Sequence, residues 1–162
     1  MWPQSLRRAP DTRERNKPMK MMKKAAFALL LMAGPGLALA QTDADMLTII
    51  TSDEEQTQAM ALILTMQAQR ADASPQVLLC DDAGELAVAS EASDSEVLRG
   101  PDASPAQMVR RLVDHGVQVD VCAIFLPNSE YTDTDLIDGV GVAQPPAIGA
   151  IVADPAVRLF TF

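Results

Sequence analysis

Two cysteines are the residues of this 162-residue sequence best suited to chemistry. Cys122 lies in the stretch GVQVDVCAIFLPNS, residues 116–129, and Cys80 ends a second apolar run, QVLLC. A cysteine thiolate is a nucleophile, and two cysteines can close a disulfide. Free cysteine can also be an inert core residue, because it packs as a small hydrophobe. Three states therefore stay open for Cys122: reactive thiol, disulfide and buried side chain.

The stretch around Cys122 has the alternation of a β-strand that delivers the thiol near its carboxyl end. One face is uniformly apolar and is expected to face a core: Val117, Val119, Val121, Ala123 and Phe125. The other face begins with polar residues: Gln118, Asp120, Cys122, Ile124 and Leu126. We therefore expect Cys122 to share a face with Asp120 that solvent can reach.

The rest of the chain predicts strands that alternate with helices. Strands are expected at 46–51, 76–80, 140–143 and 157–162, and helices at 55–70, 105–114, 132–139 and 145–152. Ser52 with Glu55, and Ser104 with Gln107, have the spacing of capping boxes. The helix at 55–70 is apolar nearly all round at 59–64, so both of its sides should be covered, one by the sheet and the other by a neighbouring helix or another subunit. The pattern predicts a three-layer α/β/α domain with a mainly parallel sheet of four or five strands.

Ligands of such folds bind at the carboxyl ends of the strands. Turns after three predicted strands should meet at that edge, where a binding site is expected. The candidate residues in these turns are Ser52, Asp53, Asp81, Asp82, Cys122 and Asn128. The aspartates would disfavour a thiolate, because like charges repel.

Other kinds of site are not indicated by the spacing of residues. His115, the only histidine, is expected to end a helix far from Cys122. The segment 132–135 lacks the ligand spacing of a calcium loop, so helix capping explains it better. Zinc spacing, a phosphate loop and a serine nucleophile set are missing, so we predict neither a metal nor a cofactor.

The first forty residues have the features of a cleaved secretory signal rather than of a fold. Basic residues precede the apolar run AAFALLLM (25–32), and small residues precede Gln41. The run is too short for a permanent membrane span, so no membrane anchor is predicted. The signal core is placed at 19–40. The polar residues before it form either a basic tail or the product of a start codon assigned too early. Residues 41–162 are expected to form a single domain in the periplasm or outside the cell.

Charge separates at the same position. The whole chain has a net charge of −9, but residues 41–162 contain five arginines and twenty acidic residues, a net charge of −15. Nucleic acids and anionic membranes attract cationic surfaces, so neither is an expected partner. An oxidising compartment would allow Cys80 to pair with Cys122. That bond would close a loop of about forty residues, worth about 4 kcal/mol in the chain-entropy model.

Four segments together resemble the DsrE/DsrF-like family, also called the YchN-like fold: MLTIITSDEEQTQAMALIL, GVQVDVCA, DLIDGVGVAQPPAIGAIV and VRLFTF. The resemblance covers residues 46–162 and implies a homotrimer or homohexamer. It also implies that Cys122 carries sulfur as a persulfide, supplied by a small sulfur donor or a partner thiol protein. Cys80 and the stretch 83–102 have no counterpart in the family pattern.

Two functions follow from these observations. The first is an exported sulfur carrier or sulfurtransferase-like protein that acts through a persulfide on Cys122. The alternative is a non-catalytic oligomeric binding or structural module in which the cysteine is paired or buried.

Overall fold

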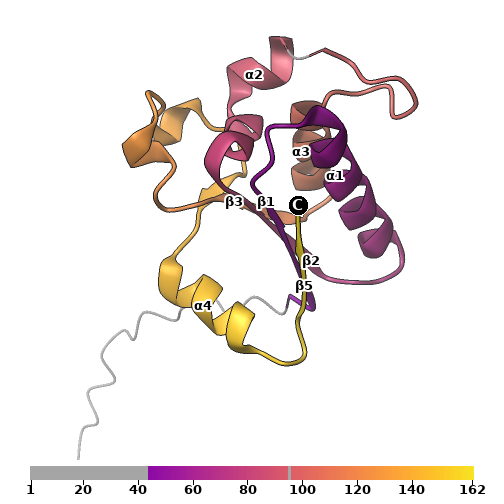
Figure 1. Ribbon diagram of the computed structural model, residues 1–162, viewed down its shortest axis with the longest axis vertical. Coiled ribbons are helices and arrows are strands. Elements are labelled where there is room, and N and C mark those ends of the chain that lie inside the picture. The colour runs from indigo at the N-terminus through magenta and orange to yellow at the C-terminus, as the bar shows by residue number, and fades with distance from the viewer. Residues whose placement is uncertain (1–43, 95) are drawn as a thin grey trace, which may run out of the picture. The chain divides into compact units, whose positions relative to one another are not determined.

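The computed structural model describes residues 44–94 and 96–162, which contribute five strands to one parallel sheet (Figure 1). The strands stand in the order β4-β3-β2-β1-β5. Their bounds are β1 Met46–Ile50, β2 Pro75–Leu79, β3 Gln118–Val121, β4 Gly141–Val142 and β5 Arg158–Thr161. The predicted parallel sheet is confirmed, with five strands.

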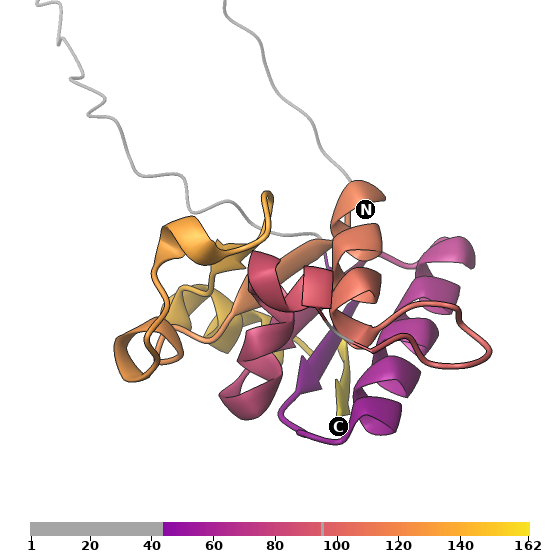
Figure 2. The ribbon, with the colours of Figure 1, turned by 90° about the horizontal axis from the view of Figure 1, so that it is seen from above.

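Helices cover both faces of the sheet. Their bounds are α1 Glu55–Arg70, α2 Ala89–Asp94, α3 Pro105–Asp114 and α4 Pro145–Ala153. Short 3-10 helices occupy Asp81–Ala87 (η1), Leu126–Asn128 (η2) and Asp133–Asp135 (η3). α3 packs against both α1 and α2, and the view from above shows it between them (Figure 2).

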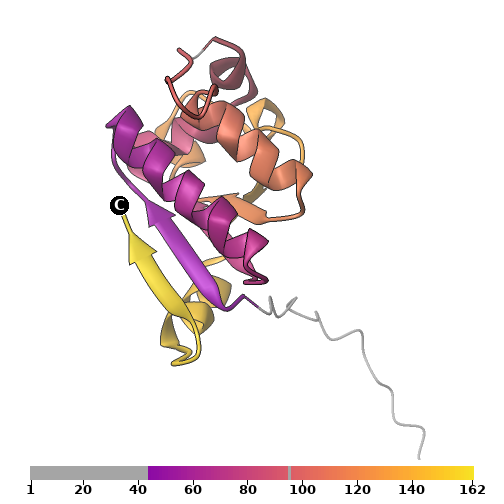
Figure 3. The ribbon, with the colours of Figure 1, turned by 90° about the vertical axis from the view of Figure 1, so that its right-hand side faces the viewer.

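Strand order explains which face each helix covers. Going from β1 through β2 to β3, the chain moves across the sheet in one direction, and right-handed crossovers then put α1 and α3 on the same face. The step from β4 to β5 runs in the opposite direction, so α4 crosses the other face. Figure 3 shows α1 and α3 together in front of the sheet. The three-layer α/β/α prediction is confirmed.

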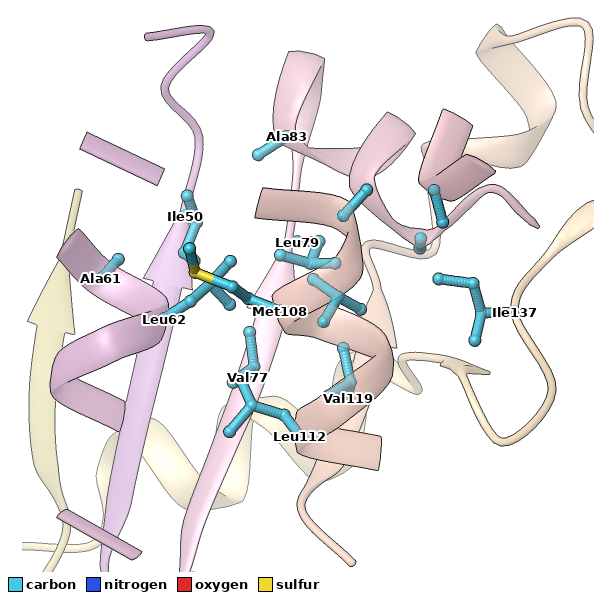
Figure 4. Close-up of a cluster of buried hydrophobic side chains, with 14 of the residues drawn as sticks. Ile50, Ala61, Leu62, Val77, Leu79, Ala83, Met108, Leu112, Val119 and Ile137 are labelled. Atoms are coloured by element: carbon cyan, nitrogen blue, oxygen red, sulfur yellow. The ribbon is translucent and has the colours of Figure 1, made fainter. Parts of the chain in front are cut away.

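Each face of the sheet has its own apolar cluster. Ile50, Val77 and Leu79 pack with Leu62 of α1 and Leu112 of α3 in the larger cluster (Figure 4). The smaller cluster lies on the α4 face and contains Leu47, Leu78, Ala143 and Ile151. Because both faces are covered, the central strands are apolar on both sides.

Of the two capping boxes predicted at Ser52 and Ser104, the one at Ser104 is correct and the one at Ser52 is wrong. Ser104 Oγ accepts the Gln107 backbone N–H, and Gln107 Oε1 accepts the Ser104 N–H, as in a capping box. α1 begins at Glu55 as predicted, but its N-cap is Glu54 and no side chain caps it. The Ser52 hydroxyl instead accepts the Glu54 N–H at 3.1 Å, because it lies two residues too early for the cap.

The predicted long strand around Cys122 is shorter than its alternation suggested. Val117, Val119 and Val121 are buried as expected. The strand then ends at Val121, and a turn begins with the hydrogen bond from Phe125 N to Cys122 O. Asp120 was expected to be accessible, yet only 7% of it is exposed, because the α4 face is covered too.

One expectation about helices stays a prediction and another is wrong. α1 is open on its outer side in the single chain, where Met60 and Leu64 are 52% and 46% exposed, so the cover expected there stays a prediction for another subunit. The helix expected over 132–139 is only the 3-10 helix η3, Asp133–Asp135. Thr132 is its N-cap and forms a capping box with Asp135, as predicted. The predicted signal segment 1–40 lies outside the described residues. Within the described residues, no helix has the length and apolar character needed to cross a membrane.

Candidate functional site

A cavity of about 830 Å³ opens at the carboxyl edge of β2 and β3. Both cysteines, several carboxylates and an aromatic pair line it. Its lining residues are Cys80, Asp81, Asp82, Glu85, Cys122, Ile124, Phe125, Asn128, Ser129, Glu130 and Tyr131. The volume is in the range of cavities that hold small ligands.

The parallel register of β2 and β3 brings the two cysteines together. Leu79 pairs with Val121, so the next residues along the two strands, Cys80 and Cys122, are neighbours at the sheet edge. Their Cα atoms are 5.0 Å apart and their sulfur atoms form a disulfide. That Cα separation is ordinary for a disulfide. Both side chains are half-buried, so they contact the cavity and the protein interior.

The backbone fixes the position of each cysteine. Cys80 N–H donates to Ile50 O at 2.9 Å, and Cys122 N–H donates to Leu79 O at 2.8 Å. These bonds continue the sheet by one residue beyond the strands. The backbone then turns sharply at Asp81, whose φ of +54° is left-handed, a conformation that aspartate tolerates better than most residues.

An aromatic pair forms one wall of the cavity. The rings of Phe125 and Tyr131 stack with centroids 6.3 Å apart and planes 23° from parallel. Desolvation raises the pKa of the Tyr131 phenol above its ordinary value, and carboxylates add to this effect, led by Glu91 and Glu85. Both effects disfavour the charged phenolate form of Tyr131.

Gly84 packs against the Phe125 ring of this aromatic wall. A Cβ at position 84 would collide with the ring of Phe125, so the ring lies directly on the η1 backbone. We expect Gly84→Ala to displace the ring and lower the free energy of unfolding by about 1–3 kcal/mol, the usual effect of overpacking. Urea unfolding at equilibrium measures this change.

The matched control is Gly149→Ala in α4. No atom lies within 4 Å of a Cβ placed there. The alanine should stabilise the helix by about 0.5–1 kcal/mol, because glycine loses more backbone entropy on folding. Equal effects of the two substitutions would contradict the packing of Phe125 on Gly84.

The structure brings some predicted site residues together and leaves others outside. Asp81, Asp82 and Asn128 line the cavity with the cysteines, whereas Ser52 and Asp53 do not. Ser52 instead organises the start of α1, where its carbonyl accepts the Gln58 side-chain amide at 2.7 Å. Sequence reasoning gave no site role to six lining residues: Glu85, Ile124, Phe125, Ser129, Glu130 and Tyr131. The only tyrosine of the chain, beside a proline turn, was the available signal.

The other candidate ligands have structural partners. The side chain of Asp135 accepts the Thr132 backbone N–H and hydroxyl at 2.8 and 2.7 Å, and these bonds lower the pKa of the Asp135 carboxyl. His115 is the C-cap of α3, with Nδ1 2.7 Å from Arg111 O. Across 44–94 and 96–162, no three His, Cys, Asp or Glu side chains are placed to hold a metal ion.

Asp120 belongs to a separate buried network. Its Oδ2 accepts the side-chain amides of Gln76 and Gln118 at 2.9 and 2.8 Å. Gln76 is 2% exposed, and its Oε1 has no hydrogen-bond partner in the structure. Gly141 on β4 leaves room for the carboxylate, because a Cβ there would collide with Asp120 Oδ1. Asp120 therefore serves the sheet rather than the cavity.

Comparisons with known proteins show the fold. No protein-family model matches the chain, and no curated protein matches it. The chain is similar to the structure of the ychN protein from E. coli, with a TM-score of 0.55 and 17% identity over 72% of this chain and 98% of that one. It is also similar to MTH1491 from Methanobacterium thermoautotrophicum, a protein of unknown function, with a TM-score of 0.52 and 21% identity over 74% and 100%. The YchN-like fold predicted from the sequence is confirmed.

Proposed function

We propose that this protein of YchN-like fold carries sulfur as a persulfide on Cys122, with Cys80 as the thiol that releases it. One observation carries the proposal: the two cysteines are paired and both line the carboxyl-edge cavity. A sulfur carrier needs a thiol that a small donor can reach, and a second thiol at this distance gives the carried sulfur a way out.

The chemistry balances with the two cysteines and an external sulfur donor. The Cys122 thiolate attacks the outer sulfur of a donor persulfide, R–S–S⁻; the donor S–S bond breaks, R–S⁻ leaves, and Cys122 holds the sulfur. The Cys80 thiolate then attacks Cys122 Sγ, closes the disulfide and releases hydrosulfide. An external dithiol supplies the two electrons that reopen the pair. Alternatively, an acceptor thiolate attacks the outer sulfur and takes it.

Intact mass spectrometry with thiol labelling tests the proposal. The reduced protein is incubated with thiosulfate, polysulfide or a persulfide donor. We expect a species heavier by one sulfur atom, followed by the disulfide form with release of sulfide. If no donor adds sulfur to the reduced protein, the proposal is wrong.

The second candidate is the structural module. Cys80 and Cys122 are half-buried and pack against the apolar cluster under α4, which favours a bond that only ties β2 to β3. The bond spans 42 residues and would stabilise the fold by about 4 kcal/mol. Under this alternative, reduction lowers the unfolding free energy and neither thiol reacts quickly in the native protein.

We also propose that the chain is exported before it acts. The basic, apolar and small residues that precede Gln41 support this. The pairing of Cys80 with Cys122 agrees with an oxidising compartment. Intact mass of the protein recovered from a periplasmic fraction should correspond to a chain that starts at Gln41. Recovery of only the full chain, from the cytoplasmic fraction, would contradict export.

A homo-oligomer is the third part of the proposal. Leu159 and Phe160 of β5 are 44% and 41% exposed, and no described strand pairs with the outer edge of β5. Phe160 pairs in register with Thr48, whose hydroxyl is 2.9 Å from that of Thr65 on α1. Phe160 therefore lies on the same face as α1, whose exposed residues include Met60 and Leu64. A second copy would cover this surface.

Light scattering after size exclusion tests the assembly. We expect a trimer or hexamer for the natural chain, as the family resemblance implies, and smaller species for Phe160→Asp. The control is Val97→Asp, which places the same charge at a 50%-exposed valine between α2 and α3. A natural chain that is monomeric at all concentrations would contradict the proposal.

A further inference from the structure

The carboxyl-edge cavity has a strongly one-sided charge. Four of its lining residues are exposed carboxylates: Asp81, Asp82, Glu85 and Glu130. None of its described lining residues is a lysine, arginine or histidine. Because the cavity walls are partly apolar, they focus the negative potential on the space beside the disulfide.

Most arginines of the described chain lie at the opposite edge of the sheet. α1 and α3 run back from the carboxyl edge to the amino edge, and Gln69 near the end of α1 donates to His115 O at the end of α3. Arg70, Arg110 and Arg111 therefore lie in the halves of these helices toward the amino edge, and Arg158 begins β5 there. None of the five arginines of the described residues, Arg99 included, lines the cavity.

The aromatic wall adds a second feature that suits positive charge. The stacked rings of Phe125 and Tyr131 line the cavity together with Glu130. Ring faces attract ammonium and guanidinium groups, and nearby carboxylates strengthen that attraction. Neither feature suits an anionic ligand.

Building on the proposed function, we infer that the cavity selects low-molecular-weight thiols and disulfides that carry a positive charge close to sulfur. The ammonium group would lie between the carboxylates and the aromatic wall, and the sulfur would face Cys80 and Cys122. Such a ligand also supplies the positive charge that stabilises a cysteine thiolate, which the protein itself does not provide at this site.

The reaction with a disulfide ligand, RSSR, balances without a further reagent. One cysteine thiolate of the reduced pair attacks a ligand sulfur, the ligand S–S bond breaks, and one RS⁻ leaves. The other cysteine thiolate attacks the mixed disulfide, the protein disulfide closes, and the second RS⁻ leaves. The protein dithiol is oxidised and the ligand is reduced to two thiols.

Three disulfides of matched length test the selectivity. Cystamine carries two positive charges, 2-hydroxyethyl disulfide carries none, and 3,3′-dithiodipropionate carries two negative charges. Each rate of oxidation of the reduced full chain is divided by the rate of the same disulfide with dithiothreitol, which removes differences in intrinsic reactivity. We expect cystamine to exceed the dicarboxylate by about tenfold or more at low salt.

Two controls show whether the cavity charge causes the selectivity. Salt of about 1 M, where the Debye length is ~3 Å, should shrink the ratio. The triple variant Asp82→Asn, Glu85→Gln, Glu130→Gln should shrink it at low salt as well, while circular dichroism shows a folded protein. A natural chain that reacts equally with all three disulfides at low salt overturns the inference.

A measurement without sulfur chemistry separates this inference from the proposed function. Hexane-1,6-diamine matches cystamine, and suberate matches the dicarboxylate, but neither can exchange with a disulfide. Tyr131 is the only tyrosine, so fluorotyrosine labelling gives one ¹⁹F signal inside the cavity. The diamine should shift this signal in the oxidised protein and suberate should not. A shift with the diamine in a protein that takes no sulfur from any donor would refute the sulfur-carrying function and support cation selection. If the diamine causes no shift, cation selection is refuted.

Discussion

Replacing Cys122 with serine is expected to abolish sulfur loading, whereas replacing Cys80 with serine should leave loading intact and block release. In the proposed reaction only Cys122 receives the donor sulfur, and only Cys80 attacks Cys122 Sγ to expel hydrosulfide. Cys122→Ser should therefore gain no sulfur mass from any donor. Cys80→Ser should accumulate the persulfide, with sulfide release reduced to the background of the added reductant.

The two variants control for each other. Each lacks the disulfide, so each loses the same loop-closure stabilisation of about 4 kcal/mol, and any difference in sulfur loading comes from the chemistry. Both should be compared with the reduced natural chain by urea unfolding. If Cys80→Ser fails to load and Cys122→Ser loads, the roles are reversed. If both load equally well, or neither does, sulfur does not pass through this pair as proposed.

Asp120→Ala is expected to lower the free energy of unfolding by about 3 kcal/mol. The substitution removes the acceptor of the Gln76 side-chain amide, which is buried and has an unpartnered Oε1 already. A buried donor left without its partner costs about 1–3 kcal/mol, and the lost hydrogen bond to a carboxylate adds to this. Gln118 should contribute little, because it is exposed and water can replace the acceptor.

A second substitution tests that reasoning. The double variant Asp120→Ala/Gln76→Leu also removes the buried Gln76 amide, which the single variant leaves without an acceptor. Replacing both partners of a buried hydrogen bond by apolar groups can leave the free energy of unfolding nearly unchanged. We expect the double variant to be more stable than Asp120→Ala by about 2 kcal/mol in urea unfolding, with sulfur loading unchanged. A double variant no more stable than the single one would show that the loss comes from packing against Gly141 instead.

The three layers of the fold could be predicted from the sequence, because the spacing of apolar residues differs clearly between its strands and its helices. The central strands read as short apolar runs, and Ser104 with Pro105 predicts where α3 begins. The alternation around Cys122 was less reliable. It predicted that Asp120 is accessible, but α4 crosses from β4 to β5 over that face of the sheet. The residues of β3 do not indicate which face the later segment with α4 will cover.

The candidate site could be predicted in part for a related reason. Adjacent parallel strands end together, so Asp81, Asp82 and Asn128 were expected near Cys122, and all of them line the same cavity. Ser52 and Asp53 follow β1, and they lie outside the cavity because it is built by the segments that follow β2 and β3. Glu85 and Tyr131 come from turns whose paths depend on packing, such as Phe125 lying on Gly84.

The pair of cysteines also divides the chain into a part that can stretch and a part that cannot. If the molecule is pulled by its two ends, the span between Cys80 and Cys122, 42 residues apart in sequence, bears no force and is not extended while the disulfide is closed. At ~3.3–3.6 Å per residue, opening the bond adds roughly 140 Å to the length of the unfolded chain. That length contains all of η1, α2, α3 and β3. The contour length of the unfolded chain therefore depends on the redox state of the pair. Single-molecule force spectroscopy can measure that difference in length.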